Sequence, residues 1–257
     1  MSSTIPAPRA SSEGWLARAV SAEWTKLRSV RSTLWCLLGS VPLVVLWVGI
    51  TGVALRAQLA AGREGVVAVP AHHLSAEGLI YLGQFAFVAL AALSTAGEYA
   101  TGTIRATLLW VPVRHRMLVA KGLALTPVFF TGGVLLSLLG TAVASTAVGS
   151  EGGSTDWLAA LGSAAAAGTY LTAVAFITVC LAAVVRSVAG TLTTAFCLLA
   201  LLPLALAAGG APAGWLPGTA GLGLMTDASP VLALLVLTVW TIASLTGASS
   251  LLKSRDT

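Results

Sequence analysis

The sequence predicts an all-α, polytopic membrane bundle of six transmembrane helices, preceded by an amphipathic helix. Hydrophobic residues make up 57% of the 257 positions and charged residues only 9%, whereas soluble domains carry roughly a quarter charged residues. The apolar residues gather in long blocks, and about 20 residues suffice for a helix to cross a hydrocarbon core of roughly 30 Å. Lys and Arg fall between alternate blocks, which is the charge pattern of a multi-pass protein.

Six apolar blocks predict the six spans, because lipid cannot satisfy backbone polar groups and these blocks lack the alternation of barrel strands. Their only Asp, Glu, Lys or Arg residues are Glu77, at the outer end of the second block, and Lys121, just inside the third. To within a few residues, the spans are expected at 33–55, 74–96, 117–148, 157–185, 188–208 and 229–252.

The segment before the first block divides into two parts. Residues 1–14 are rich in Ser, Ala and Pro and are expected to be a disordered tail without a cleaved signal. Residues 15–32 are expected to form a cytoplasmic interface helix on the inner leaflet. One face of that helix carries, at steps of three and four, Leu16, Val20, Glu23, Leu27, Val30 and Leu34, with Trp24 beside it.

Glu23 interrupts this apolar face, and two interpretations stay open. Its carboxylate either reaches water between lipid headgroups or pairs with a cation of the 97–121 segment, such as Arg105 or Arg114, tying the surface helix to the bundle.

The charge distribution predicts cytoplasmic termini. With the N-terminus inside, the inner segments and Lys121 carry 12 of the 14 Lys and Arg residues, and only Arg56 and Arg63 fall outside. The net charge of +5 is therefore expected to meet a membrane surface and not nucleic acid. Residues 253–257 are expected to be a cytoplasmic tail.

The outer loops offer little chemistry. In the first, the adjacent His72 and His73 are expected to lie in a solvated loop, because neighbouring histidines do not readily converge on one metal ion. In the second, Ser154, Thr155 or Asp156 can cap the next helix. The third, residues 209–228, is rich in Gly and Pro yet nearly uncharged, so it is either an interfacial loop or a re-entrant element.

Nucleotide-binding, zinc-hydrolase and serine-hydrolase motifs do not occur in the sequence. The spans are expected to bury no ionisable group, which argues against an intramembrane enzyme and an ion-coupled carrier. We therefore expect no catalytic residue, no cofactor and no metal site in this chain. A bundle of this kind acts if a cytoplasmic partner pushes on it.

Two motifs resemble those of permease subunits of ABC-2 type ABC transporters, particularly the six-span, actinobacterial-like kind. One is SAEWTKLRSVRSTLW at 21–35, and the other is GEYATGTIRATLLWVPVRHRMLVAK at 97–121. A weaker match is WLPGTAG at 215–221, so the likeness covers about residues 15–255.

The resemblance implies a coupling segment at 97–116 that docks on a separate cytoplasmic ABC ATPase, which binds the ATP and Mg. The coupling residues that match the family pattern are Glu98, Tyr99, Gly102, Thr103, Ile104 and Arg105. The interface helix contributes Glu23, Trp24, Lys26, Arg28 and Arg31, and the basic positions of the loop and headgroup level are Arg114, Arg116 and Lys121.

Glu98 stands where this segment meets the second span. It is expected to stiffen that joint through an ion pair with Arg105, Arg31 or Lys121, the alternative being a solvated carboxylate at a helix end. The family pattern further implies a bacterial plasma-membrane protein that forms a homodimer or a paralogous heterodimer and exports an amphiphilic drug, antibiotic, peptide or lipid. The rival interpretation is a scaffold or sensor subunit that binds a partner and transports nothing.

Overall fold

The protein is a bundle of long helices, and its computed structural model describes residues 14–102, 114–226 and 229–254. Within these ranges the chain contains helices and turns but no strand. Six of the helical stretches are long and apolar enough to cross a membrane. This is the architecture of a multi-pass membrane protein, as the sequence predicts.

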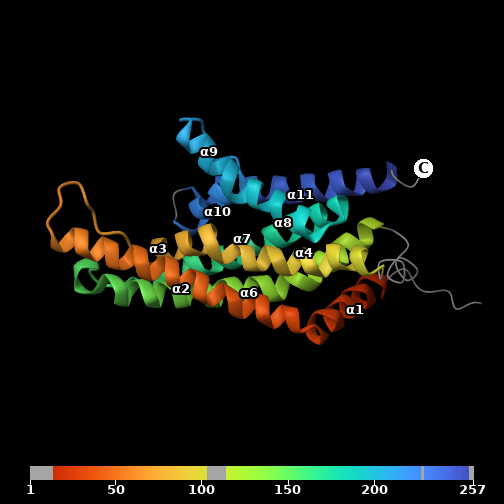
Figure 1. Ribbon diagram of the computed structural model, residues 1–257, viewed down its shortest axis with the longest axis horizontal. Helices are drawn as coiled ribbons and strands as arrows, with labels where there is room; N and C mark the ends of the chain where they lie inside the picture. Colours follow the sequence, from red (N-terminus) through yellow and green to blue (C-terminus); the bar gives the residue numbers. More distant parts are fainter. Residues whose placement is uncertain (1–13, 103–113, 227–228, 255–257) are drawn as a thin grey trace, which may run out of the picture.

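The predicted interface helix is present as α1 (Trp15–Ser29). Val30 then adopts an extended backbone, with φ −100° and ψ 121°, and forms an elbow before α2 (Arg31–Ala60). The first span is therefore longer at both ends than the apolar block 33–55. In Figure 1, α1 lies at one end of the bundle and turns sharply into α2.

The second span runs continuously through α3 (Ala71–Gly78), a π-helical turn (Leu79–Gly83) and α4 (Gln84–Thr101). It ends at Gly102, whose backbone has φ +73°. This is the left-handed conformation, which glycine adopts without strain. Gly97, Glu98 and Tyr99 thus belong to the last turns of α4 and do not follow the span as its block 74–96 suggests.

The third and fourth spans are α6 (Arg114–Val148) and α7 (Trp157–Val185), joined by a short 3₁₀ turn (Gly149–Gly152). Of the three predicted caps, Asp156 is the one used, and its side chain accepts hydrogen bonds from the N–H groups of Leu158 and Ala159. The predicted blocks 117–148 and 157–185 match these helices closely.

The fifth span consists of α8 (Val188–Phe196), a π-helical turn (Cys197–Leu201) and α9 (Leu202–Ala208). Pro203 is the second residue of α9, two positions after the π-helical turn ends. A short helix α10 (Pro217–Met225) comes next, and α11 (Pro230–Ser254) forms the last span.

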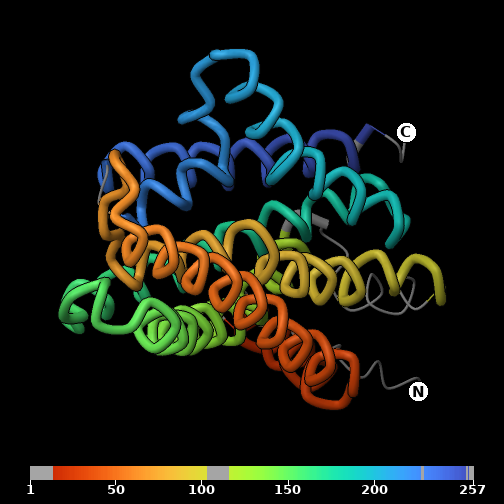
Figure 2. Tube along the Cα trace, turned by 60° about the vertical axis from the view of Figure 1, so that its left-hand side comes forward, coloured from red at the N-terminus to blue at the C-terminus, as the bar shows by residue number. Residues whose placement is uncertain are grey.

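Helix α7 lies at the centre of the bundle, in contact with α4, α6, α10 and α11. Figure 2 shows α2 and α6 on one side and α8, α9 and α11 on the other, with α4 between them. The α3–α4 and α7 spans are the most enclosed, whereas α2, α8–α9 and α11 expose many apolar side chains. Those exposed faces suit contact with lipid.

Candidate functional site

The strongest concentration of charge in the described chain lies where α1, α4 and α6 meet. Glu23 and Lys26 come from α1, Glu98 from the last turns of α4, and Lys121 from the start of α6. We call these four residues the ion cluster. It lies at the α1 end of the bundle, the end at which α4 and α7 stop and α6 begins (Figure 1).

Lys121 is the centre of the ion cluster. Its Nζ donates to Glu23 Oε2 at 2.5 Å, to the carbonyl oxygen of Ser94 at 2.9 Å and to Glu98 Oε1 at 3.0 Å. An ammonium group has three donors, and each therefore has an acceptor. The side chain is only 2% exposed, so these contacts replace the water that a buried cation loses.

Lys26 bridges the same two carboxylates from the solvent side. Its Nζ lies 2.7 Å from Glu23 Oε1 and 2.9 Å from Glu98 Oε1. Its side chain is 44% exposed, in contrast to Lys121. Two cations thus alternate with two carboxylates, and the cluster carries no net charge when all four groups are ionised.

Burial and pairing act in opposite directions on the two α1 residues. Burial would raise the pKa of the Glu23 carboxyl, but the charges and hydrogen bonds of Lys121 and Lys26 outweigh it and hold that pKa below its ordinary value. Burial would likewise lower the pKa of Lys26, whereas Glu23 and Glu98 raise it above its ordinary value. Both α1 groups are therefore charged near neutral pH.

Two cation–π contacts flank the cluster. The guanidinium carbon of Arg116 lies 4.6 Å from the ring centre of Trp15, which joins the start of α1 to the start of α6. The guanidinium carbon of Arg186, just after α7, lies 5.4 Å from the ring centre of Tyr99. These contacts fasten the start of α1 and the end of α4 to neighbouring helices.

The structure decides between the alternatives for Glu23 and Glu98. Glu23 pairs with a cation of the 97–121 segment, and that cation is Lys121; the solvated alternative is wrong, since the residue is 6% exposed. Glu98 pairs with Lys121, one of its three expected partners, and also with Lys26, a partner that the sequence did not suggest.

The other predicted site residues are distributed as follows. Trp24 is partly buried against the core, and Arg28 and Arg31 are exposed on α1 and at the start of α2. Arg114 begins α6. Thr103, Ile104 and Arg105, the middle of the predicted coupling segment, lie outside the described residues.

One expectation is corrected by the ion cluster. The apolar blocks predict spans that bury no ionisable group, yet Lys121 is buried within the third candidate span, Arg116–Gly152. Lys121 is close to the start of that span, and for this reason the sequence analysis places it at the headgroup level. The buried cation is tolerated because α1 and α4 deliver two carboxylates to it.

A groove of about 550 Å³ opens beside the cluster, between the α1–α2 elbow and α4. Leu27, Val30, Leu90 and Leu93 give it an apolar wall, and Ser29, Ser32 and Thr33 add hydroxyl groups to its lining. Polar and apolar surfaces thus adjoin at the α1 end of the bundle.

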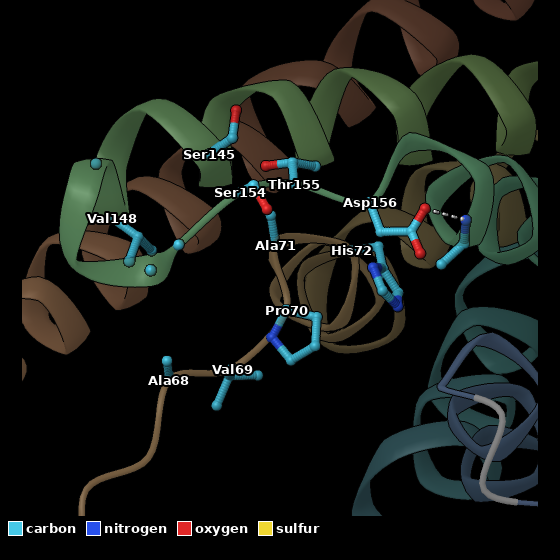
Figure 3. Close-up of a pocket in the computed structure, with 14 residues that line it drawn as sticks. Ala68, Val69, Pro70, Ala71, His72, Ser145, Val148, Ser154, Thr155 and Asp156 are labelled. Atoms are coloured by element: carbon cyan, nitrogen blue, oxygen red, sulfur yellow. Dashed lines mark hydrogen bonds between the residues drawn. The ribbon is translucent and has the colours of Figure 1, made fainter.

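A second pocket, of about 280 Å³, lies at the opposite end (Figure 3). It is lined by the 68–72 segment, the end of α6 and the 152–156 loop. His72 is only 6% exposed and belongs to α3, so the prediction of a solvated loop is wrong for this residue. No three His, Cys, Asp or Glu side chains in the described parts of the chain gather closely enough to hold a metal ion.

Gln84 and Tyr170 form a polar pair inside the bundle that the sequence analysis did not predict. The hydroxyl of Tyr170 in α7 donates to Gln84 Oε1 at 2.5 Å, and Gln84 Nε2 donates to the carbonyl oxygen of Ile80. Both side chains are fully buried. A lone glutamine within the apolar block 74–96 was the signal that could have revealed this pair.

The third loop contains a short helix, α10, that packs inside the bundle. In α10, Gly218 packs against the carbonyl group of Leu199 and Gly221 against the ring of Tyr170. Leu199 and Tyr170 lie near the middle of the fifth and fourth spans, so α10 enters the bundle to about half its depth. This favours the re-entrant alternative for residues 209–228 over the interfacial loop.

Comparisons of this chain with protein-family models, with curated proteins and with solved structures found no match.

Proposed function

We propose that this protein is the permease subunit of an ABC-2 type ABC transporter and forms the path by which an amphiphilic substrate leaves a bacterial cell. A separate cytoplasmic ATPase supplies ATP hydrolysis and carries the ATP and Mg. Two permease copies, identical or paralogous, complete the transporter in the plasma membrane. Six spans, an interface helix and a basic α1 end support this proposal.

The ion cluster is the observation that carries the proposal. It joins α1 to the end of α4, where the 97–116 segment proposed to dock on the ATPase begins, and to the first turns of α6, where that segment ends. A push on the segment is then transmitted to three helices together, because a buried, fully paired cation resists separation of its partners. Movement of α4 and α6 would open or close the path.

Co-purification with candidate ATPases tests the partner, and transport by the complex in vesicles tests the activity. We expect a stable complex, ATP hydrolysis stimulated by an amphiphilic compound, and ATP-dependent accumulation of that compound. Glu98→Gln should keep the ATPase bound but lower transport per ATP hydrolysed, because the carboxylate shared by Lys26 and Lys121 loses its charge.

A suitable control is Glu151→Gln, which removes an exposed carboxylate at the opposite end of the bundle. It should leave transport unchanged. A complex that binds an ATPase without transporting any compound would favour the scaffold or sensor function, and unchanged coupling in Glu98→Gln would remove the role of the ion cluster.

A further inference from the structure

Glu77 is an acidic residue within the second candidate span, away from the ion cluster. It lies in the last turn of α3, within the candidate span Ala71–Thr101. A Cβ at the adjacent Gly78 would lie 3.0 Å from Val48 and 3.3 Å from Trp47, so this turn packs against the middle of α2. Along its own span, Glu77 lies roughly 9 Å from the first residue, Ala71, and roughly 30 Å from Glu98. Glu77 is thus in the part of the span that is farthest from the ion cluster.

No cation of the described chain neutralises this carboxyl group. Glu77 forms no ion pair with the described Lys, Arg or His residues, in contrast to Glu23 and Glu98. Its polar neighbour is the indole N–H of Trp47, although the two side chains form no regular hydrogen bond. The side chain is partly exposed on the flank of the bundle. Such a residue is costly in a membrane and is typically retained for function.

Two aromatic rings adjoin the carboxyl group. Trp47 and Tyr81 lie with their ring centres 5.1 Å apart and their planes at 41°. Tyr81 follows Glu77 by about one helical turn and is 43% exposed. The faces of aromatic rings attract cations, and aromatic groups combined with a negative charge recognise quaternary ammonium ligands. Carboxylate, indole and phenol therefore present one cation-attracting surface to the membrane.

We propose that Glu77, Trp47 and Tyr81 bind a lipophilic organic cation, such as a hydrophobic amine or a quaternary onium ion, that arrives through the lipid. A metal ion is a poor match, since a single carboxylate supplies too few oxygen ligands. The proposal rests on the transport function above and names its substrate class.

Binding to the full chain in nanodiscs of uncharged lipid tests the site without any ATPase. Tetraphenylphosphonium is the probe, and tetraphenylborate, of similar size and opposite charge, is the matched control ligand. We expect the phosphonium to bind saturably and the borate not to bind at this site. Glu77→Gln should weaken phosphonium binding roughly tenfold, and Tyr81→Leu should weaken it by a smaller factor, roughly threefold to fivefold.

Glu64→Gln is the control variant, because it removes an exposed loop carboxylate outside the site, and it should bind as the unaltered chain does. Tyr81→Leu changes an exposed side chain, so it tests the site even if Glu77→Gln fails to assemble. Equal binding of the two probes, or full phosphonium affinity in both variants, would overturn the site. A loss of dimer mass in Glu77→Gln with unchanged binding would instead assign Glu77 to a contact between copies and also overturn it.

The two proposals fail differently. If no ATPase drives transport but the phosphonium still binds through Glu77, the cation site stands and the transport function fails. If ATP-dependent transport of other amphiphiles occurs while Glu77→Gln has no effect on phosphonium binding, the transport function stands and the cation site fails.

Discussion

Lys121 Nζ lies 2.5 Å from Glu23 Oε2, although the two residues are 98 positions apart in the chain. This contact attaches an amphipathic surface helix to the start of a transmembrane helix. Glu98 completes it from a third helix. Two of these helices, α4 and α6, flank the segment proposed to receive the ATPase, which makes the ion cluster the first place to test.

Replacing Lys121 by Met should destabilise the α1 end of the bundle. The substitution takes from the enclosed carboxylates of Glu23 and Glu98 the buried cation that both contact, and breaking a buried ion pair in this way typically costs about 3 to 5 kcal/mol. Thermal unfolding in detergent and tryptic cleavage of α1 measure the effect. Lys26→Met, at the half-exposed cation, should cost less, about 1 kcal/mol or below. Equal effects of the two variants would contradict the central position of Lys121.

Attachment of α1 should be constant over a wide pH range. The pKa of Glu23 is lowered from its ordinary value of 4.5, so its contribution is present above about that pH and is lost as pH falls through the lowered pKa. The pKa of Lys26 is raised from 10.5, so its contribution is present below that pH and is lost only as pH rises through the raised pKa.

Spin labels at the exposed Thr25 in α1 and Leu123 in α6 report this attachment as a distance. The distance should stay unchanged between about pH 5 and pH 10 and increase outside that window. A transition near neutral pH would contradict the ionised state of Glu23 and Lys26 at that pH. Glu23→Gln should remove most of the change on the acid side.

The two glycines that flank Glu98 and Tyr99 should respond oppositely to alanine. Gly102 has φ +73°, where an L residue is strained by roughly 1 to 2 kcal/mol, so Gly102→Ala should destabilise the end of α4. Gly97 is helical with open space at its Cβ position, so Gly97→Ala should be neutral or stabilising by about 0.5 to 1 kcal/mol. Equilibrium unfolding of both variants checks the signs.

Alanine at Gly218 should displace α10 from the bundle. A Cβ there would collide with the backbone carbonyl of Leu199, which cannot move aside as a flexible side chain does. We expect a loss of about 1 to 3 kcal/mol, as for other overpacking substitutions. Gly223→Ala is the matched control within α10, since its nearest neighbour would be Ser229 Oγ at 3.7 Å. Cysteine accessibility in the 209–216 loop should increase only in the first variant.

Tyr170→Phe should destabilise the centre of the bundle by about 1 to 3 kcal/mol, because Gln84 Oε1 loses its donor while remaining buried. The double variant Tyr170→Phe with Gln84→Leu removes both polar partners and should recover part of this loss. Unfolding of the single and double variants measures the difference. A loss of stability in the double variant equal to the sum of the two single losses would show that the pair has no net coupling.

The sequence by itself determined the number of spans, their approximate limits and the place of the amphipathic helix. Block length and charge placement suffice for these features, because a single helix must satisfy its own backbone and cover its own apolar length in lipid. The block 157–185 matches α7 at both ends. Span ends were less accurate where polar residues stay helical, as in the last turns of α4.

Only the tertiary structure decided which groups meet. Four features depend on contacts between helices that are distant in the chain. They are the pairing of Lys26 with Glu98, the burial of Lys121, the Gln84–Tyr170 pair and the depth of α10. Local sequence pattern specifies the face and length of each helix but not its rotation and height against a neighbour. Close packing between helices sets this rotation and height. It brings a carboxylate from α1 and another from α4 to the same lysine, Lys121.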